Sequence, residues 1–283
     1  MRFANLAGRA TLVVDGRAVD IERASGGALG PDPMVMSDLA HHDVLRQLAG
    51  SVAAHDWPEV DVTVLAAPVP RPRKGFGVAL NYRAHADETG RPHPTEPGLF
   101  GKSENCVCGP FDDVVVPAGR DHVDYEAELV IVFGRTCRAV GEDEAWTYLA
   151  GVTCGQDISD RAEQRRPPVN QFTVAKSYDT FGPIGPYLVT VDDLPERDAL
   201  AIEGRLNGDV VQRSRTDDLI FPVPEIVAWL SRYITFQPGD LVWTGTPSGV
   251  GEARTPQRFL RDGDVLETEL EGVGTMRNRM VVR

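Results

Sequence analysis

The sequence has few cysteines, no long apolar run and a shortage of basic charge. Four cysteines in 283 residues, with no CxxC pair, are too few for a disulfide framework, so we expect free thiols. No run reaches the roughly 18 apolar residues that a membrane helix needs. The first residues also lack the apolar core of a signal peptide. We therefore expect a cytoplasmic protein.

Acidic residues outnumber basic ones. The chain has 29 Lys and Arg against 42 Asp and Glu, a net charge of −13 with histidines neutral. Nucleic acids and anionic membranes are bound through clustered basic groups, so both are excluded as partners. Hydrophobic residues at 42% and charged residues at 25% are typical of a globular protein, which excludes disordered, coiled-coil and collagen-like classes.

A proline-rich stretch from Pro68 to Pro72 divides the chain, because prolines favour an extended linker. We predict a small N-terminal domain over residues 1–67 and a larger domain over residues 68–283. In the first, Asp15-Gly16 between two apolar runs predicts a β-hairpin. Behind an expected N-cap at Ser37, helical spacing predicts a helix that ends near Gly50.

The larger domain shows mainly strand and turn patterns. The strands expected there are Val114–Val116, Tyr125–Phe133, Pro186–Thr190, Ile202–Leu206 and Val210–Gln212. The helices expected are Glu142–Ala150 and Val223–Ile234. Because helices do not alternate regularly with strands, the sequence favours a mostly β, α+β fold over a doubly wound parallel sheet.

The strand around residue 126 places carboxylates on one face. With a period of two, Asp124, Glu126 and Glu128 alternate with an apolar face that begins at Tyr125. Closely spaced carboxylates repel unless a cation compensates, and hard oxygen ligands suit Mg²⁺, Mn²⁺ or Ca²⁺. A half-buried strand with a solvated acidic face is the alternative interpretation.

Two further residues favour a metal site. After a predicted helix and a short apolar run, a loop could return Asp157 to the face of Glu126 and Glu128. Lys176 lies between apolar and Pro/Gly-rich segments, which is unusual for a solvated lysine, and could balance the remaining negative charge. A second metal site is conceivable from Cys106, Cys108 and His122, but these lack structural-zinc spacing.

Six short motifs, taken in order, resemble the fumarylacetoacetate hydrolase family over nearly all of residues 76–280. The resemblance implies a mixed β-roll of stacked sheets with a small N-terminal domain, and a homodimer with one Mg²⁺ or Mn²⁺ per subunit. The motifs are Asn81-Tyr82-Arg83-Ala84-His85, Asp124-Tyr125-Glu126-Ala127-Glu128-Leu129, Gln156-Asp157-Ile158-Ser159-Asp160-Arg161, Lys176-Ser177-Tyr178-Asp179-Thr180-Phe181, Asn207-Gly208 and Gly245-Thr246-Pro247-Ser248-Gly249-Val250-Gly251.

The resemblance also assigns roles to residues. It implies metal ligation by Glu126, Glu128 and Asp157, and a substrate-facing cation at Lys176. It implies a water-activating dyad of His85 and Glu88, whose spacing of three fits one face of a helical turn. The substrate-binding positions that it implies are Arg161, Gln164, Gly245 and Thr246. The last two do not form a phosphate loop, because no GK[ST] follows them.

These roles predict hydrolysis of a carbon–carbon bond in a β-diketo acid or acylpyruvate. The metal would chelate the two oxygens and stabilise an enolate, while the dyad activates water. The same site could instead isomerise a 2-hydroxydienoate or decarboxylate an oxaloacetate-like acid. A catalytically silent binding protein is a further alternative, although it would be expected to lack the acids or the dyad. In each case the expected partner is a small anionic keto acid or diketo acid.

Overall fold

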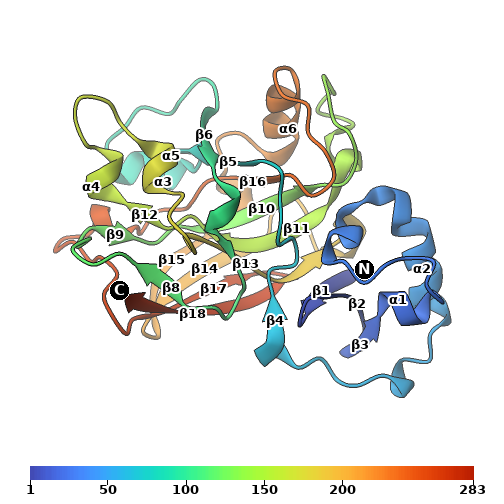
Figure 1. Ribbon diagram of the computed structural model, residues 1–283. Coiled ribbons are helices and arrows are strands. Elements are labelled where there is room, and N and C mark those ends of the chain that lie inside the picture. Colours follow the sequence, from blue (N-terminus) through green and yellow to red (C-terminus); the bar gives the residue numbers. More distant parts are fainter.

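Two sheets and a short strand pair form the framework of the protein, which this computed structural model describes over residues 1–283 (Figure 1). The larger sheet contains β1 (Arg2–Leu6), β2 (Arg9–Val14), β3 (Arg17–Asp20), β4 (Leu65–Ala66), β5 (Gly75–Ala79), β6 (Gly98–Lys102), β7 (Val107–Cys108), β10 (Ala127–Phe133), β11 (Leu149–Gln156), β13 (Gly182–Val189) and β16 (Leu241–Trp243). Its order is β3-β2-β1-β13-β11-β10-β16-β5-β6, with β4 paired to β1 and β7 to β13. The strand that carries Glu128, β10, therefore lies in the interior of this sheet.

The smaller sheet runs in the order β15-β14-β17-β18-β8. Its strands are β8 (Val114–Val116), β14 (Ala201–Leu206), β15 (Asp209–Arg215), β17 (Val265–Leu270) and β18 (Gly274–Val282). A separate pair joins β9 (Val123–Asp124) to β12 (Ser159–Asp160). The predicted mostly β, α+β fold is confirmed.

Helices are short and few. They are α1 (Ile21–Ala24), α2 (His42–Ser51), α3 (Arg83–Glu88), α4 (Arg161–Gln164), α5 (Phe172–Ala175) and α6 (Val223–Ser231). In Figure 1, α3, α4 and α5 gather near β9 and β12. None of the helices combines the length and apolar character that crossing a membrane requires.

Both faces of the larger sheet are covered. On one face, Leu129 and Ile131 of β10 pack in a core with Ile202 of the smaller sheet and Ile226 of α6. On the other, Val130 and Val132 pack in a core that includes residues of β1 and β2. All seven residues of β10 are therefore buried, as expected for a central strand covered on both faces.

The N-terminal residues extend this sheet. β1 pairs with β13, and the hairpin of β2 and β3 continues outward from it. The hairpin at Asp15-Gly16 is confirmed, with positive φ angles of 49° and 74° at its two turn residues. The domain boundary at residue 67 stays a prediction, while the strand pairing makes the first segment continuous with the larger sheet.

Three details of the sequence interpretation are wrong. Residues 142–150 do not form a helix: Ala145–Tyr148 is a single 3₁₀ segment, after which the chain enters β11, where it pairs with β10. The helix behind Ser37 begins only at His42, because Asp38 caps a separate 3₁₀ turn over Leu39–His41.

The third error concerns Tyr125. The chain leaves regular strand geometry between β9 and β10, so Tyr125 packs in a different core from Ala127, with which it was expected to share a face. The other expected strands are present, and α6 covers the predicted helix up to Ser231.

All four cysteines are free, as expected, and all four are buried. Cys106, Cys108 and His122 do not form a cluster of metal-ligating atoms; the one such cluster in the chain is acidic.

Candidate metal centre and active site

Glu126, Glu128 and Asp157 converge at one point inside the protein. One carboxylate oxygen from each lies within 4.8 Å of those from the other two. The three residues are 6%, 2% and 0% exposed. The alternative of a solvated acidic face is therefore wrong.

Antiparallel pairing of β10 with β11 brings the acids together. Ala127 pairs with Gln156, so Asp157 follows directly beside Glu126, whose carbonyl accepts a 2.9 Å hydrogen bond from the Asp157 N–H. The Gln156 side-chain oxygen accepts a 2.8 Å bond from the Glu126 N–H. Asp157 thus returns to the acidic face as predicted, but from the end of a strand.

Lys176 lies between two of these acids. Its Nζ is 2.7 Å from Glu126 Oε2 and 2.7 Å from Asp157 Oδ2, and it donates to Ser159 Oγ at 2.7 Å. The side chain is 3% exposed. The sequence interpretation of Lys176 as a buried counter-charge to this cluster agrees with these contacts.

A second buried lysine was missed. Lys102, at the end of β6, places its Nζ 2.6 Å from Asp157 Oδ1 and 2.7 Å from the Lys176 carbonyl. Both Lys102 and Asp157 have fully buried side chains. Asp157 is therefore held between two ammonium groups, which fixes the orientation of its carboxylate.

Arg161 is the third cation at the site. Its Nη2 lies 2.7 Å from Glu126 Oε1 and 2.9 Å from Asp124 Oδ2. Asp124 in turn accepts hydrogen bonds from the N–H groups of Gly251 and Glu252. This carboxylate anchors Arg161 and the 251–252 loop and does not belong to the acidic cluster.

The charges nearly cancel. Four carboxylates, on Asp124, Glu126, Glu128 and Asp157, face Lys102, Lys176 and Arg161, which gives 3 − 4 = −1 when all are ionised. A divalent cation would bring the sum to +1. A site with that charge suits a small anion.

The two glutamates differ in how they are stabilised. Burial disfavours the charged form of Glu126, but the charges of Lys176 and Arg161 outweigh it and lower the pKa of Glu126 to about 2. Burial, followed by the negative charges of Asp157 and Glu126, raises the pKa of Glu128 well above its usual range. The Glu128 carboxylate receives one hydrogen bond, from the Gly245 N–H at 2.7 Å.

This donor set fits a hard divalent cation. Three convergent carboxylates are the oxygen ligands that Mg²⁺ and Mn²⁺ prefer. Glu128 has the fewest protein partners and the strongest need for a compensating charge. A cation bound here would meet that need.

His85 and Glu88 form the pair that their spacing predicts. Both are on α3, with His85 Nδ1 3.2 Å from Glu88 Oε2. Glu88 Oε1 also accepts a 2.9 Å hydrogen bond from the Gly249 N–H, so the carboxylate is tied to a distant loop. The side chains are 12% and 24% exposed, which leaves them accessible to water.

The residues expected to bind substrate have internal partners. Thr246 Oγ1 donates to the Ala127 carbonyl and accepts from the Gln212 side chain. The Gly245 N–H is used by Glu128, and Gln164 accepts a 3.2 Å bond from Arg161. Their assignment to substrate stays a prediction.

A cleft opens onto the acidic cluster. Seven of the ten predicted site residues line it: His85, Glu126, Glu128, Arg161, Gln164, Lys176 and Thr246. Val78, Leu80, Phe100 and Phe172 add an apolar wall. Glu88, Asp157 and Gly245 stand behind this lining and hold it through the contacts given above.

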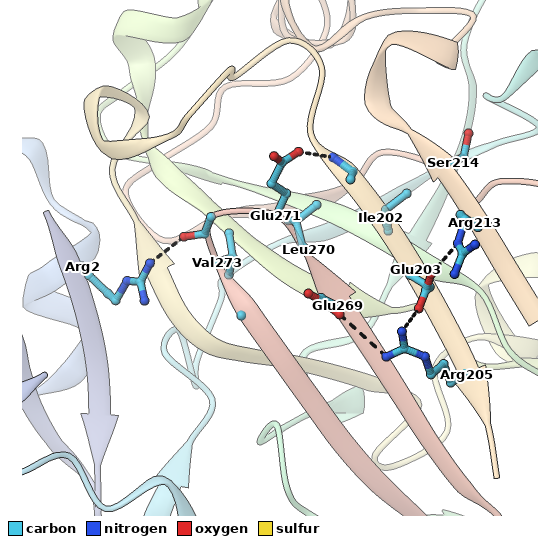
Figure 2. A pocket seen from close by; sticks show the side chains of 13 residues that line it. Arg2, Ile202, Glu203, Arg205, Arg213, Ser214, Glu269, Leu270, Glu271 and Val273 are labelled. Atoms are coloured by element: carbon cyan, nitrogen blue, oxygen red, sulfur yellow. Dashed lines mark hydrogen bonds and ion pairs between the residues drawn. The ribbon is translucent and has the colours of Figure 1, made fainter. Parts of the chain in front are cut away.

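A second, larger hollow of about 1020 Å³ lies elsewhere, over the turn between β17 and β18 (Figure 2). Its charged side chains are satisfied within the protein. Arg2 donates to the Gly272 carbonyl at 2.7 Å, Arg213 pairs with Glu203, and Arg205 lies 3.8 Å from Glu269. This hollow therefore offers no uncommitted charge and none of the acidic cluster.

A comparison with family models identifies the family. Residues 74–281 match the model described as fumarylacetoacetate (FAA) hydrolase C-terminal. The chain belongs to the fumarylacetoacetate hydrolase family.

Three relatives indicate the range of reactions. Human oxaloacetate tautomerase FAHD2A, mitochondrial, is 41% identical over 79% of this chain and 71% of its own length. The 2,4-didehydro-3-deoxy-L-rhamnonate hydrolase of Sphingomonas sp. (strain SKA58) is 40% identical over 83% of this chain and 88% of its own. The crystal structure of maleylpyruvate hydrolase from Sphingobium sp. SYK-6 in complex with manganese(II) ion and pyruvate is 31% identical, with a TM-score of 0.82, covering 100% of this chain and 99% of that one. The chain is thus an enzyme of a family that includes hydrolases and isomerases.

Proposed function

We propose that the protein hydrolyses a carbon–carbon bond in a β-diketo acid of the acylpyruvate type, with Mg²⁺ or Mn²⁺ held by Glu126, Glu128 and Asp157. The observation that carries this proposal is that His85, whose ring is held by Glu88, lines the same cleft as Glu126 and Glu128. A base in this position can activate the water that hydrolysis requires, whereas a tautomerase would use it only to move a proton within the substrate.

The chain's own residues can perform the proton transfers. With Nδ1 directed at Glu88, the other ring nitrogen of His85 is left to take a proton from water. The Glu88 carboxylate stabilises the imidazolium that results, and Gly249 keeps Glu88 in place. Lys176 supplies a buried positive charge beside the substrate oxygens.

The reaction balances without a further reactant. The oxygen of water bonds to the acyl carbon, and the bond from that carbon to the methylene group breaks. Its electron pair goes to the pyruvate half as an enolate, which takes up a proton, and the other product is a carboxylic acid. When bound, the divalent cation would supply Lewis-acid stabilisation of the negative charge on the two oxygens.

Keto–enol tautomerisation is the second candidate. The identity to a relative named oxaloacetate tautomerase favours it. Isomerisation of a 2-hydroxydienoate and decarboxylation of an oxaloacetate-like acid use the same charge stabilisation, and neither needs an attacking water. A catalytically silent protein is disfavoured because the acids, the lysine and the dyad are all present in one site.

The test is an assay of purified protein with acylpyruvates, 2-hydroxydienoates and oxaloacetate, each with Mg²⁺, Mn²⁺ or EDTA. We expect pyruvate release from an acylpyruvate that depends on the metal. Intact acylpyruvates together with an absorbance change of a dienoate, or with enol-to-keto conversion of oxaloacetate, would replace hydrolysis by isomerisation. The same preparations run on a size-exclusion column with light scattering test the expected homodimer.

A further inference from the structure

Three arginines line the cleft, and they differ in what they already bind. Arg161 is paired with Asp124 and Glu126, as described above. Arg165 makes a two-pronged ion pair with Glu252. Arg91 lines the same cleft, yet its guanidinium has no hydrogen-bond or ion-pair partner in the protein.

The nearby acids do not neutralise Arg91. Asp87, four residues earlier, lies 2.9 Å from His93 Nε2, and Glu88 is used by His85 and Gly249. Glu252 is already shared by Arg165 and Arg161. Arg91 is therefore the one arginine of the cleft whose charge remains free for a ligand.

The backbone holds Arg91 in a fixed relation to the catalytic pair. Gly90 has a positive φ of 64° and ends α3, and the Arg91 N–H donates to the Ala86 carbonyl at 3.0 Å. His85 and Arg91 are thus carried by one short helix and the three residues that follow it. A ligand that reaches both would be aligned by this single element.

We propose that Arg91 determines specificity by binding a second carboxylate, at the end of the substrate away from the keto-acid group. This rests on the proposed function, and it narrows the substrate class to β-diketo acids that carry two carboxylates. The apolar wall of Val78, Leu80, Phe100 and Phe172 suits the hydrocarbon chain between the two charged ends. Arg91 is a binding residue here and takes no part in proton transfer.

Binding of uncleavable keto acids tests this directly. The probes are 2-oxo acids of equal length that end either in a carboxylate or in a methyl group, for example 2-oxoadipate and 2-oxohexanoate, together with their shorter and longer homologues. Calorimetric titrations with saturating Mg²⁺ would compare the wild type with Arg91→Gln. Arg73→Gln is the matched control, because both Arg91 and Arg73 are exposed but Arg73 lines a different hollow.

We expect the wild type to bind at least one dicarboxylate on the order of tenfold more tightly than its methyl-ended partner. Arg91→Gln should abolish this preference while leaving the affinity for the methyl-ended acid unchanged, and Arg73→Gln should keep it. A preference that survives in Arg91→Gln, or equal losses for both kinds of probe, would overturn the assignment of Arg91.

Turnover separates this inference from the function on which it rests. If the wild type cleaves methyl-ended and carboxylate-ended acylpyruvates with equal kcat/KM, hydrolysis stands and the role of Arg91 fails. If no acylpyruvate is cleaved but Arg91→Gln still loses the binding preference, the proposed reaction fails and the second-carboxylate site stands.

Discussion

Replacing Lys102 by methionine should destabilise the metal-free protein strongly. The variant keeps the length of the side chain but removes the ammonium group that lies 2.6 Å from Asp157 Oδ1 and 2.7 Å from the Lys176 carbonyl. Both partners of this ion pair are fully buried, so no water can replace the lost charge. Breaking a buried pair costs about 3–5 kcal/mol in the free energy of unfolding, and because Lys176 Nζ remains 2.7 Å from the other carboxylate oxygen of Asp157, we expect the lower end, about 3 kcal/mol.

Lys74→Met is the matched control. Lys74 Nζ lies at the same 2.6 Å from a buried carboxylate, Asp240, but its own side chain is 33% exposed. Asp240 also retains hydrogen bonds from two backbone N–H groups, those of Lys74 and Gln237. The expected loss is about 1 kcal/mol, in the range of exposed pairs.

Thermal unfolding in EDTA, followed by circular dichroism, measures the difference. For a chain of this size, roughly 2 °C per kcal/mol gives melting temperatures lowered by about 6 °C for Lys102→Met and about 2 °C for Lys74→Met. Saturating Mg²⁺ should recover part of the loss only in Lys102→Met, since a cation beside Asp157 replaces the missing charge. Equal losses in the two variants would refute the account of Asp157 as a carboxylate that depends on Lys102.

Three further predictions concern the cluster and the dyad. Glu126→Gln and Glu128→Gln should fold but lose Mg²⁺ binding in calorimetry; unchanged affinity in either would exclude that residue as a ligand. The folded, metal-free protein holds a proton on Glu128 more tightly than the unfolded chain does, so the free energy of unfolding should fall as pH rises from about 4.5 through the raised pKa of Glu128. Mg²⁺ affinity should rise over the same pH interval, and an affinity independent of pH would contradict this. Glu88→Ala should lose acylpyruvate cleavage before any decarboxylation of oxaloacetate, measured as pyruvate formation at matched metal concentration, and equal losses would count against a water-activating dyad.

The pairing of Glu126 with Glu128 could be predicted from sequence, although Asp124, which alternation placed on the same face, lies outside the cluster. Alternation placed Glu126 and Glu128 together without any knowledge of neighbouring strands. The i,i+3 spacing of His85 and Glu88 gave a contact for the same local reason.

Features that depend on distant pairing could not be predicted in this way. Lys102 ends a glycine-containing strand, and nothing in its surroundings marks it as buried; its partner Asp157 is 55 residues away. The sequence 142–150 has acceptable helix formers, yet the pairing of β11 with β10 takes the chain into the sheet from Leu149. β5 was missed because Gly75 and Gly77 interrupt its alternation, although it pairs in parallel with β16.

The central claim is that His85 activates a water that cleaves an acylpyruvate, and oxygen-isotope labelling tests it most directly. With Mg²⁺ in ¹⁸O-labelled water, the wild type should release pyruvate and a carboxylic acid whose new carboxylate carries one ¹⁸O by mass spectrometry. His85→Ala should bind Mg²⁺ and an uncleavable keto acid normally, yet form this labelled acid about a hundredfold more slowly or worse. An intact acylpyruvate in the wild type, or label incorporation at the same rate in His85→Ala, would contradict the claim.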